Sequence, residues 1–137
     1  MAVQLVRYED VEVIRLPGRD LRWLADAHTL GTQQISFAVM HCPANSVVKP
    51  LHSHKEVEEV LLVLAGKGEV WVDGETAIFQ QGDAVLLPAG SMHQVRNVGK
   101  KMVVTVSIFG CPMGREAYTV YEKDVFSALG EGRREDE

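Results

Sequence analysis

Residues 52–97 read HSHKEVEEVLLVLAGKGEVWVDGETAIFQQGDAVLLPAGSMHQVRN, and this stretch decides both the fold and the chemistry of the chain. It opens on two histidines, His52 and His54, separated by one residue. Positions two apart in a strand point to the same face of the sheet, so both imidazoles can be directed at one point. A pair of histidines alone is a weak signal, and the rest of the stretch has to supply further ligands.

Those further ligands are a carboxylate and a third imidazole. Glu58 and Glu59 follow within five residues of the histidine pair, and His93 lies near the far end of the stretch. Three neutral imidazoles and one carboxylate form a mixed nitrogen and oxygen set that suits a first-row divalent metal. A set of this kind leaves a coordination position open for a substrate, as catalytic metal sites require. Either glutamate could supply the carboxylate on this reasoning alone.

The pattern around these residues predicts an all-β domain. Short runs rich in valine, isoleucine and leucine recur every 8 to 12 residues or so, with glycine, proline, asparagine or aspartate between them. This rhythm is typical of a sandwich or barrel. The sharpest hairpin signal is Asp73-Gly74, which lies between two strand-like runs at 69–72 and 76–79. No internal repeat is visible, which indicates one barrel and not two fused ones.

Two motifs in this stretch resemble the conserved motifs of the cupin superfamily. The first consists of His52, His54, Glu59 and Gly66. The second consists of Gly82, Pro88, Gly90, His93 and Asn97. The first motif usually opens with a glycine six residues before its first histidine, where this chain has Ser46. That glycine serves a turn and not a ligand, so the expected fold is unaffected.

The resemblance implies a single Greek-key, jelly-roll β-barrel with a metal inside its wide end. It implies that His52, His54, Glu59 and His93 are the metal ligands. The spacing to the glycine of the first motif favours Glu59 over Glu58, and neighbouring strand residues face opposite sides. We expect one divalent transition metal per chain, with iron or manganese favoured and nickel, zinc or copper as alternatives.

The chain is expected to divide into three parts. Residues 1–30 form an N-terminal strand arm that packs on the barrel or on a partner subunit, which favours a homodimer. Residues 31–130 form the barrel and end in a short strand and a small C-terminal helical turn within 117–129. Residues 131–137 are almost all charged or glycine, and we expect them to be disordered.

Composition narrows the class of protein. The chain has 137 residues and a net charge of -5, so it has the length of one domain and lacks the basic balance that binding to nucleic acid requires. No apolar run is long enough to span a membrane, and no signal peptide is visible, so the expected location is cytoplasmic. Cys42 and Cys111 are interpreted as buried hydrophobic residues, with a disulfide or a reactive thiol as the less favoured interpretation.

A small substrate pocket is expected beside the metal. Its predicted walls are residues on the inward faces of three strands, namely Phe37, Val39, His41, Leu61, Val63 and Val95. For His41 alone, a solvent-exposed position at a strand end is favoured over the pocket, and His28 is interpreted as a surface residue. No arginine or lysine falls clearly on an inward position, which argues against a sugar phosphate or dicarboxylate as substrate.

The leading functional hypothesis is a metal-dependent enzyme that acts on a small molecule. Within that class we favour a dioxygenase-like oxidoreductase with a small apolar or enolic substrate. A metal-dependent isomerase, lyase or decarboxylase is the first alternative, and a non-catalytic ligand-binding or sensor cupin is the second. A metal-free structural barrel is disfavoured, because buried polar side chains are costly without partners.

Overall fold

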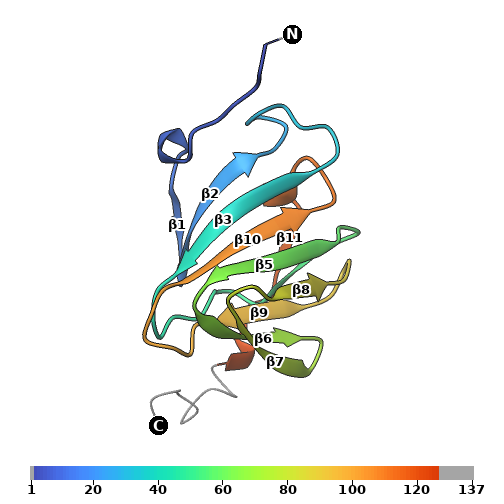
Figure 1. Cartoon of the computed structure of the whole chain (residues 1–137). Helices are drawn as coiled ribbons and strands as arrows, with labels where there is room; N and C mark the ends of the chain where they lie inside the picture. The colour runs from blue at the N-terminus through green and yellow to red at the C-terminus, as the bar shows by residue number, and fades with distance from the viewer. Residues whose placement is uncertain (1, 127–137) are drawn as a thin grey trace.

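The structure is a computed structural model that describes residues 2–126, and it consists of two antiparallel sheets that face each other (Figure 1). The six-stranded sheet has the order β1 (Ile14–Leu16), β2 (Arg19–Ala25), β3 (Ser36–Cys42), β10 (Val103–Phe109), β5 (Glu59–Ala65) and β8 (Ala84–Leu87). The five-stranded sheet has the order β11 (Tyr118–Val120), β4 (His52–His54), β9 (His93–Arg96), β6 (Lys67–Val72) and β7 (Glu75–Gln80). Two single-turn 3₁₀ helices, at Tyr8–Asp10 and Gly114–Glu116, complete the elements. The fold is a jelly-roll sandwich, as predicted, and hydrogen bonds do not close its two sheets into one continuous barrel.

Two of the predicted turns determine how the strands pair. Asp73 and Gly74 both have positive φ, at 45° and 97°, and they join β6 to β7 as the predicted hairpin. Gly66 lies between β5 and β6 with a φ of 87°. A Cβ atom there would lie 2.5 Å from the carbonyl oxygen of Met102, so the chain can pass from one sheet to the other only with glycine at this position.

Asn97, the last residue of the second motif, has a structural role. Its amide nitrogen donates to the carbonyls of Cys42 at 2.9 Å and Lys101 at 2.7 Å. Its side-chain oxygen accepts a hydrogen bond from the backbone N–H of Gly99 at 2.9 Å. The buried side chain therefore ties the end of β9 to the loops that follow β3 and precede β10.

The core fills the space between the two sheets. Its buried members come from both sheets and include Leu21, Trp23, Ala38, Met40, Cys42, Val48, Leu61, Val63, Val70, Phe79, Leu87, Val95, Val103 and Phe109. Trp23 and Phe109 pack with ring centroids 5.4 Å apart. Ala38 lies directly opposite Trp23 in the register of the β2–β3 pair.

Ser36, Ala38, Met40 and Cys42 are all buried on the inner face of β3. The sequence pattern predicts Phe37, Val39 and His41 on the inner face, and the structure places them on the other face. Both faces of this strand carry apolar residues, so hydrophobic alternation alone does not distinguish them.

The terminal regions add strands to both sheets. The stretch expected to be an arm supplies β1 and β2, and β2 pairs with β3 along most of its length. At the other end β11 pairs with β4, and Val125 and Phe126 begin the expected helical turn. The predicted tail, 131–137, lies outside the described residues. Within 2–126, no helix has the length and apolar character needed to cross a membrane.

Candidate metal centre

The three histidines of the two motifs meet on neighbouring strands. His52 on β4 lies directly opposite His93 on β9 in the antiparallel register, and His54 follows two residues along on the same face. One ligand nitrogen from each of the three lies within 4.8 Å of the other two. All three side chains are buried. The convergence predicted from the His-x-His spacing is therefore present in the structure.

Glu59 brings a carboxylate to the same point from the opposite sheet. Its Oε1 lies 3.1 Å from Nε2 of His54 and 3.5 Å from Nε2 of His93. Glu59 is the first residue of β5 and is buried, whereas the adjacent Glu58 has an exposed side chain. The backbone carbonyl of Glu58 accepts a hydrogen bond from Gly110 N–H at 3.1 Å, which holds the start of the strand in place. Of the two glutamates, only Glu59 reaches the histidine cluster.

Backbone carbonyls orient two of the imidazoles. The Nδ1–H of His52 donates to the carbonyl of Pro50 at 2.9 Å, and the Nδ1–H of His93 donates to the carbonyl of Ser91 at 3.1 Å. Because a carbonyl can only accept, both rings hold their proton on Nδ1 and present Nε2 as a lone pair. In metal-binding histidines, a hydrogen bond from the ring nitrogen that does not bind the metal fixes the tautomer in this way.

The unsatisfied atoms at this point fit a cation. Among the described residues, four buried atoms have no hydrogen-bond partner here: both ring nitrogens of His54, Oε1 of Glu59 and Nε2 of His93. Buried polar atoms nearly always have a hydrogen-bond partner, so several atoms without one at the same point require an explanation. A metal ion bound by one ring nitrogen of His54, Nε2 of His93 and Oε1 of Glu59 would satisfy three of these four atoms, and the donor set suits a first-row divalent ion.

Electrostatics keep these groups ready to bind a cation. Burial, with the neighbouring His93 as the next cause, lowers the pKa of His52 to about 3, so this imidazole is neutral at neutral pH. Burial alone would raise the pKa of Glu59, but its contacts with His54 and His93 outweigh that and lower it to about 2. Neutral imidazole and ionised carboxylate are the protonation states that metal binding needs.

A small internal cavity of about 30 Å³ adjoins the cluster. Such a volume holds about two water molecules. It is lined by residues from both sheets, namely Arg19, Leu21, Met40, Val48, His52, Glu59, Leu61, Leu87, His93, Val95, Ser107 and Tyr118. The lining is apolar except around the histidine cluster and at three further side chains, those of Arg19, Ser107 and Tyr118.

The predicted pocket residues divide into three groups. Leu61 and Val95 line the cavity, and Val63 is buried in the core without lining it. Phe37, Val39 and His41 lie on the other face of β3, where Met40 takes their place in the cavity wall. The Nε2 atom of His41 lies 3.5 Å from the hydroxyl of Tyr8 instead.

Sequence reasoning missed Arg19 and Tyr118. The sequence predicts a strand arm within residues 1–30, and in the structure β2 of this region begins at Arg19. Arg19 therefore shares the inward face with Leu21 and Trp23, contrary to the expectation that no cation would point inward. The alternation of the full strand could have placed it there. Nothing in the sequence near Tyr118 indicates that β11 lies beside β4.

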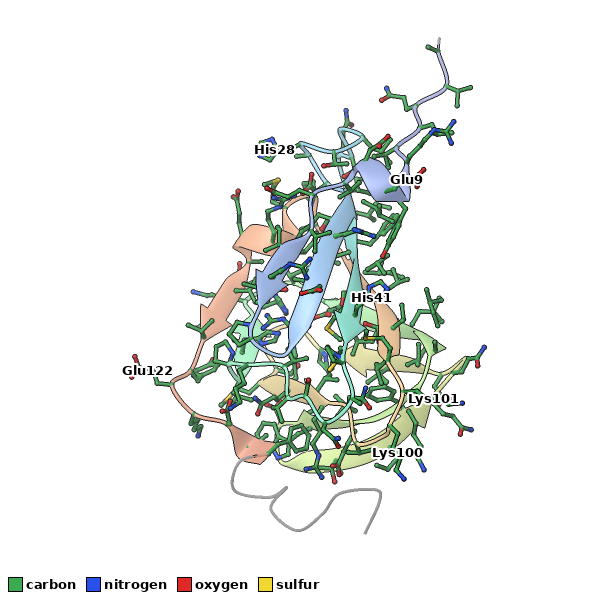
Figure 2. All side chains as sticks on the ribbon, turned by 90° about the vertical axis from the view of Figure 1, so that its left-hand side faces the viewer. Glu9, His28, His41, Lys100, Lys101 and Glu122 are labelled. Atoms are coloured by element: carbon green, nitrogen blue, oxygen red, sulfur yellow. The ribbon has the colours of Figure 1, made fainter. Side chains whose placement is uncertain are left out.

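The remaining histidines and the cysteines lie apart from the cluster. Figure 2 shows His28 in the loop at the end of the molecule opposite Lys100 and Lys101, and its side chain is exposed. Cys42 is buried and Cys111 is partly buried, and both are free thiols. Burial raises the pKa of Cys42 to about 11, which makes it an inert core residue.

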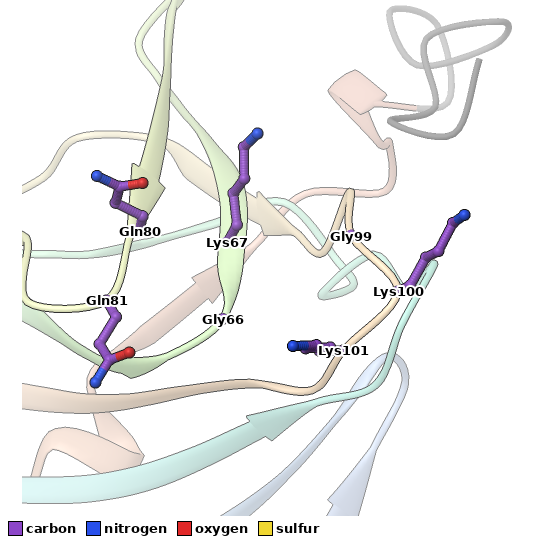
Figure 3. Close-up of a pocket in the computed structure, with 7 residues that line it drawn as sticks. All are labelled: Gly66, Lys67, Gln80, Gln81, Gly99, Lys100 and Lys101. Atoms are coloured by element: carbon purple, nitrogen blue, oxygen red, sulfur yellow. The ribbon is translucent and has the colours of Figure 1, made fainter.

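A second, larger hollow opens on the outside of the molecule (Figure 3). It has a volume of about 640 Å³ and is lined by Gly66, Lys67, Gln80, Gln81, Gly99, Lys100 and Lys101. Its lining residues come from turns and strand ends and include neither histidine nor carboxylate.

The chain is similar to several characterised proteins. It is 47% identical over 47 residues to quercetin 2,3-dioxygenase of Bacillus subtilis (strain 168), a match that spans 34% of this chain and 14% of that protein. It is 32% identical over 101 residues to polyketide synthase CurC of Streptomyces cyaneus, a match that spans 72% of this chain and 64% of that protein. The chain thus covers less than two thirds of the length of either relative.

Solved structures with the same fold include oxalate decarboxylase from Lactobacillus farciminis, with a TM-score of 0.75 at 20% identity over 90% of this chain and 36% of that chain. KdgF from Halomonas sp. has a TM-score of 0.65 at 20% identity over 77% of this chain and 92% of that chain. The family model described as a cupin domain matches residues 38–109, which include all four converging side chains. The chain therefore belongs to the cupin family.

Proposed function

We propose that this protein is a metal-dependent enzyme that binds one divalent transition metal through His52, His54, Glu59 and His93 and acts on a small molecule. The observation that carries the proposal is the set of buried, unpartnered nitrogen and oxygen atoms that these side chains direct at one point. Iron or manganese is the favoured metal, with nickel, zinc or copper as alternatives. When bound, the metal would supply a Lewis acid that polarises an oxygen of the substrate.

The chain's own residues would prepare the site for this chemistry. The carbonyls of Pro50 and Ser91 hold two imidazoles in the tautomer that presents Nε2, so little reorganisation is needed on binding. Glu59 contributes a negative charge that offsets part of the charge on the ion. The cavity has room for only about two water molecules, and this limited access of water strengthens the electrostatic interactions within it.

Within this class we favour a dioxygenase-like oxidoreductase. The identity to quercetin 2,3-dioxygenase over 47 residues supports that choice. A metal-dependent isomerase, lyase or decarboxylase is the alternative that a cationic side chain in the cavity wall supports, because such substrates often carry a carboxylate. A homodimer and a cytoplasmic location remain part of the proposal.

Turnover by metal-loaded protein tests the proposal. A panel of small enols, diketones and carboxylic acids is incubated with iron-loaded and with manganese-loaded protein, under air and under nitrogen. Turnover under air alone supports a dioxygenase, and turnover under both gases supports a lyase, isomerase or decarboxylase. Binding of a panel member without turnover under either gas would favour a non-catalytic ligand-binding cupin.

A further inference from the structure

Arg19 is a buried cation without an acidic partner. Its side chain belongs to the inward face of β2, and the residue is only 6% exposed. No carboxylate in the described part of the chain forms an ion pair with it, although the neighbouring Asp20 pairs with Arg15 at 2.8 Å. A buried charge that is not paired is costly, so it is seldom retained without a partner.

The contacts that Arg19 does make occupy only part of the guanidinium. Its Nη1 donates to the carbonyl of Pro17 at 3.1 Å and to the carbonyl of Lys49. Nε and Nη2 have no partner anywhere in residues 2–126. The two hydrogen bonds therefore hold Nη1 in place and leave the N–H groups of Nε and Nη2 available beside the cavity. A guanidinium in this position can bind a carboxylate through two hydrogen bonds.

Tyr118 lies on the same cavity and adds a second polar group. Its ring packs edge-on against His54, with centroids 4.3 Å apart, and lies 5.0 Å from the ring of His52. Its hydroxyl has no hydrogen-bond partner among the described residues. A phenol hydroxyl can donate a hydrogen bond to an anion. Arg19 and Tyr118 thus place free donors at the wall beside the histidine cluster.

We infer that Arg19 and Tyr118 form a carboxylate-binding subsite, so the substrate is a small carboxylic acid. Its carboxylate binds these two side chains, and a further oxygen atom of the substrate reaches the cluster of metal ligands. This inference rests on the proposed metal centre. With a divalent ion bound, Glu59 offsets one of its charges while Arg19 adds one, so the site as a whole is positive and selects an anion. The cavity of about 30 Å³ restricts that anion to a few non-hydrogen atoms.

A purely structural role for Arg19 makes a different prediction. In that case the arginine only fastens the loop before β4 through the carbonyl of Lys49, and any effect of its loss would fall equally on all ligands. A binding role requires that its loss affect an acid more than the matching neutral amide. The comparison of an acid with its amide therefore separates the two roles.

The experiment uses zinc-loaded full-length protein, because zinc has no redox chemistry. Glycolate and glycolamide are titrated into wild type, Arg19→Gln and Tyr118→Phe by calorimetry, and the zinc content of each sample is measured. Wild type should bind glycolate about 30-fold or more tightly than glycolamide, because only the acid forms a buried charge pair with Arg19. Arg19→Gln should keep only the preference that the zinc itself confers, so its ratio of glycolate to glycolamide affinity should be about 10-fold or more smaller than that of wild type. Tyr118→Phe should lose about 10-fold for glycolate.

Other results would overturn the subsite or the metal centre separately. If wild type holds zinc but binds glycolate no better than glycolamide, the subsite is wrong and the metal centre stands. If wild type holds no zinc, the metal centre itself fails. If Arg19→Gln does not fold, Arg19→Lys replaces it in the experiment, because lysine keeps the positive charge but lacks the planar guanidinium with its paired donors. It should keep its zinc and lose most of the preference for glycolate, and an undiminished preference would contradict the assignment.

Discussion

Two of the hollows in the described part of the chain differ greatly in size and character. The outer one measures about 640 Å³ and is lined by turn residues, glutamines and lysines (Figure 3). The inner one measures about 30 Å³ and is lined by buried side chains from both sheets. Large hollows are the usual first candidates for function, but here the ligand-competent atoms are in the small one.

The difference shows what a site requires beyond space. In the inner cavity, each functional side chain is held by a strand and by a hydrogen bond or a neighbouring ring, as with His52 at Pro50. In the outer hollow, Lys100 and Lys101 are exposed and carried by a turn. Preorganised, desolvated groups bind and polarise a ligand far more strongly than mobile groups in water. Four changes would sharpen or break this contrast.

The largest effect is expected from Phe109→Ala. Phe109 is 1% exposed and packs against both Trp23 and His54, with the ring of His54 4.9 Å away. Its removal should lower the free energy of unfolding by about 3–5 kcal/mol, because it leaves a cavity under the site. Chemical denaturation measures this. Ile78→Ala, at a position 55% exposed on β7, should stay within about 0.5 kcal/mol of wild type.

Glu59→Gln should weaken metal binding by more than about 100-fold. The variant keeps the shape of the side chain but removes its charge, and loss of a direct ligand should exceed the 10- to 100-fold cost of losing a ligand's supporting contact. Competition with a chelator of known affinity measures the change. Glu58→Gln is the matched control, because that side chain is exposed. An equal loss in both variants would contradict the assignment of the carboxylate.

The metal-free protein should lose stability as the pH falls. The pKa of His52 is about 3 in the folded state against 6.5 for a free histidine, so the unfolded chain binds the extra proton in this window. The free energy of unfolding should therefore fall as the pH drops from about 6.5 towards 3, and Glu59 adds to the loss below 4.5.

One fully linked proton gives a slope of about 1.4 kcal/mol per pH unit. His52→Gln should reduce the slope of the metal-free protein between pH 4.5 and 6 by about 1 kcal/mol per unit. Urea denaturation at several pH values gives the slope. An unchanged slope would mean that this histidine is not buried in its neutral form.

The smallest effect is expected in the outer hollow. A double variant, Lys100→Gln with Lys101→Gln, should leave metal content unchanged and any turnover within about two-fold of wild type, as expected for exposed surface changes. Elemental analysis and the substrate panel measure both. A large loss of turnover with normal metal content would show that the outer hollow takes part in function and would break the contrast.

The sequence predicted the fold and the converging side chains because their signals are local. The His52-x-His54 spacing, the Asp73-Gly74 turn and the glycines of the two motifs each act over a few residues, and the structure has the elements they predict. Selection of Glu59 over Glu58 rested on the spacing to Gly66 in the cupin motif, since the residues alone left either glutamate open. The histidine spacing and the hairpin turn follow from backbone geometry and need no knowledge of distant contacts.

The cavity wall could not be predicted in the same way, because tertiary packing decides it. On β3 both faces carry apolar residues, and the sequence alone does not show which face is turned inward. Tyr118 reaches the cavity because β11 pairs with β4 across 64 residues of sequence. Arg19 was missed because no cation was expected on an inward strand position, whereas β2 begins at Arg19 and alternates inward from there.

The most direct test of the metal centre is elemental analysis of purified protein beside a His52→Ala, His54→Ala double variant. Both proteins are prepared without chelator, offered iron, manganese, nickel, copper and zinc in turn, and checked for folding by circular dichroism. The four-ligand site predicts close to one metal ion per folded wild-type chain and none in the folded variant. A folded wild type that binds none of the five metals, or a variant that binds as much as wild type, would contradict it.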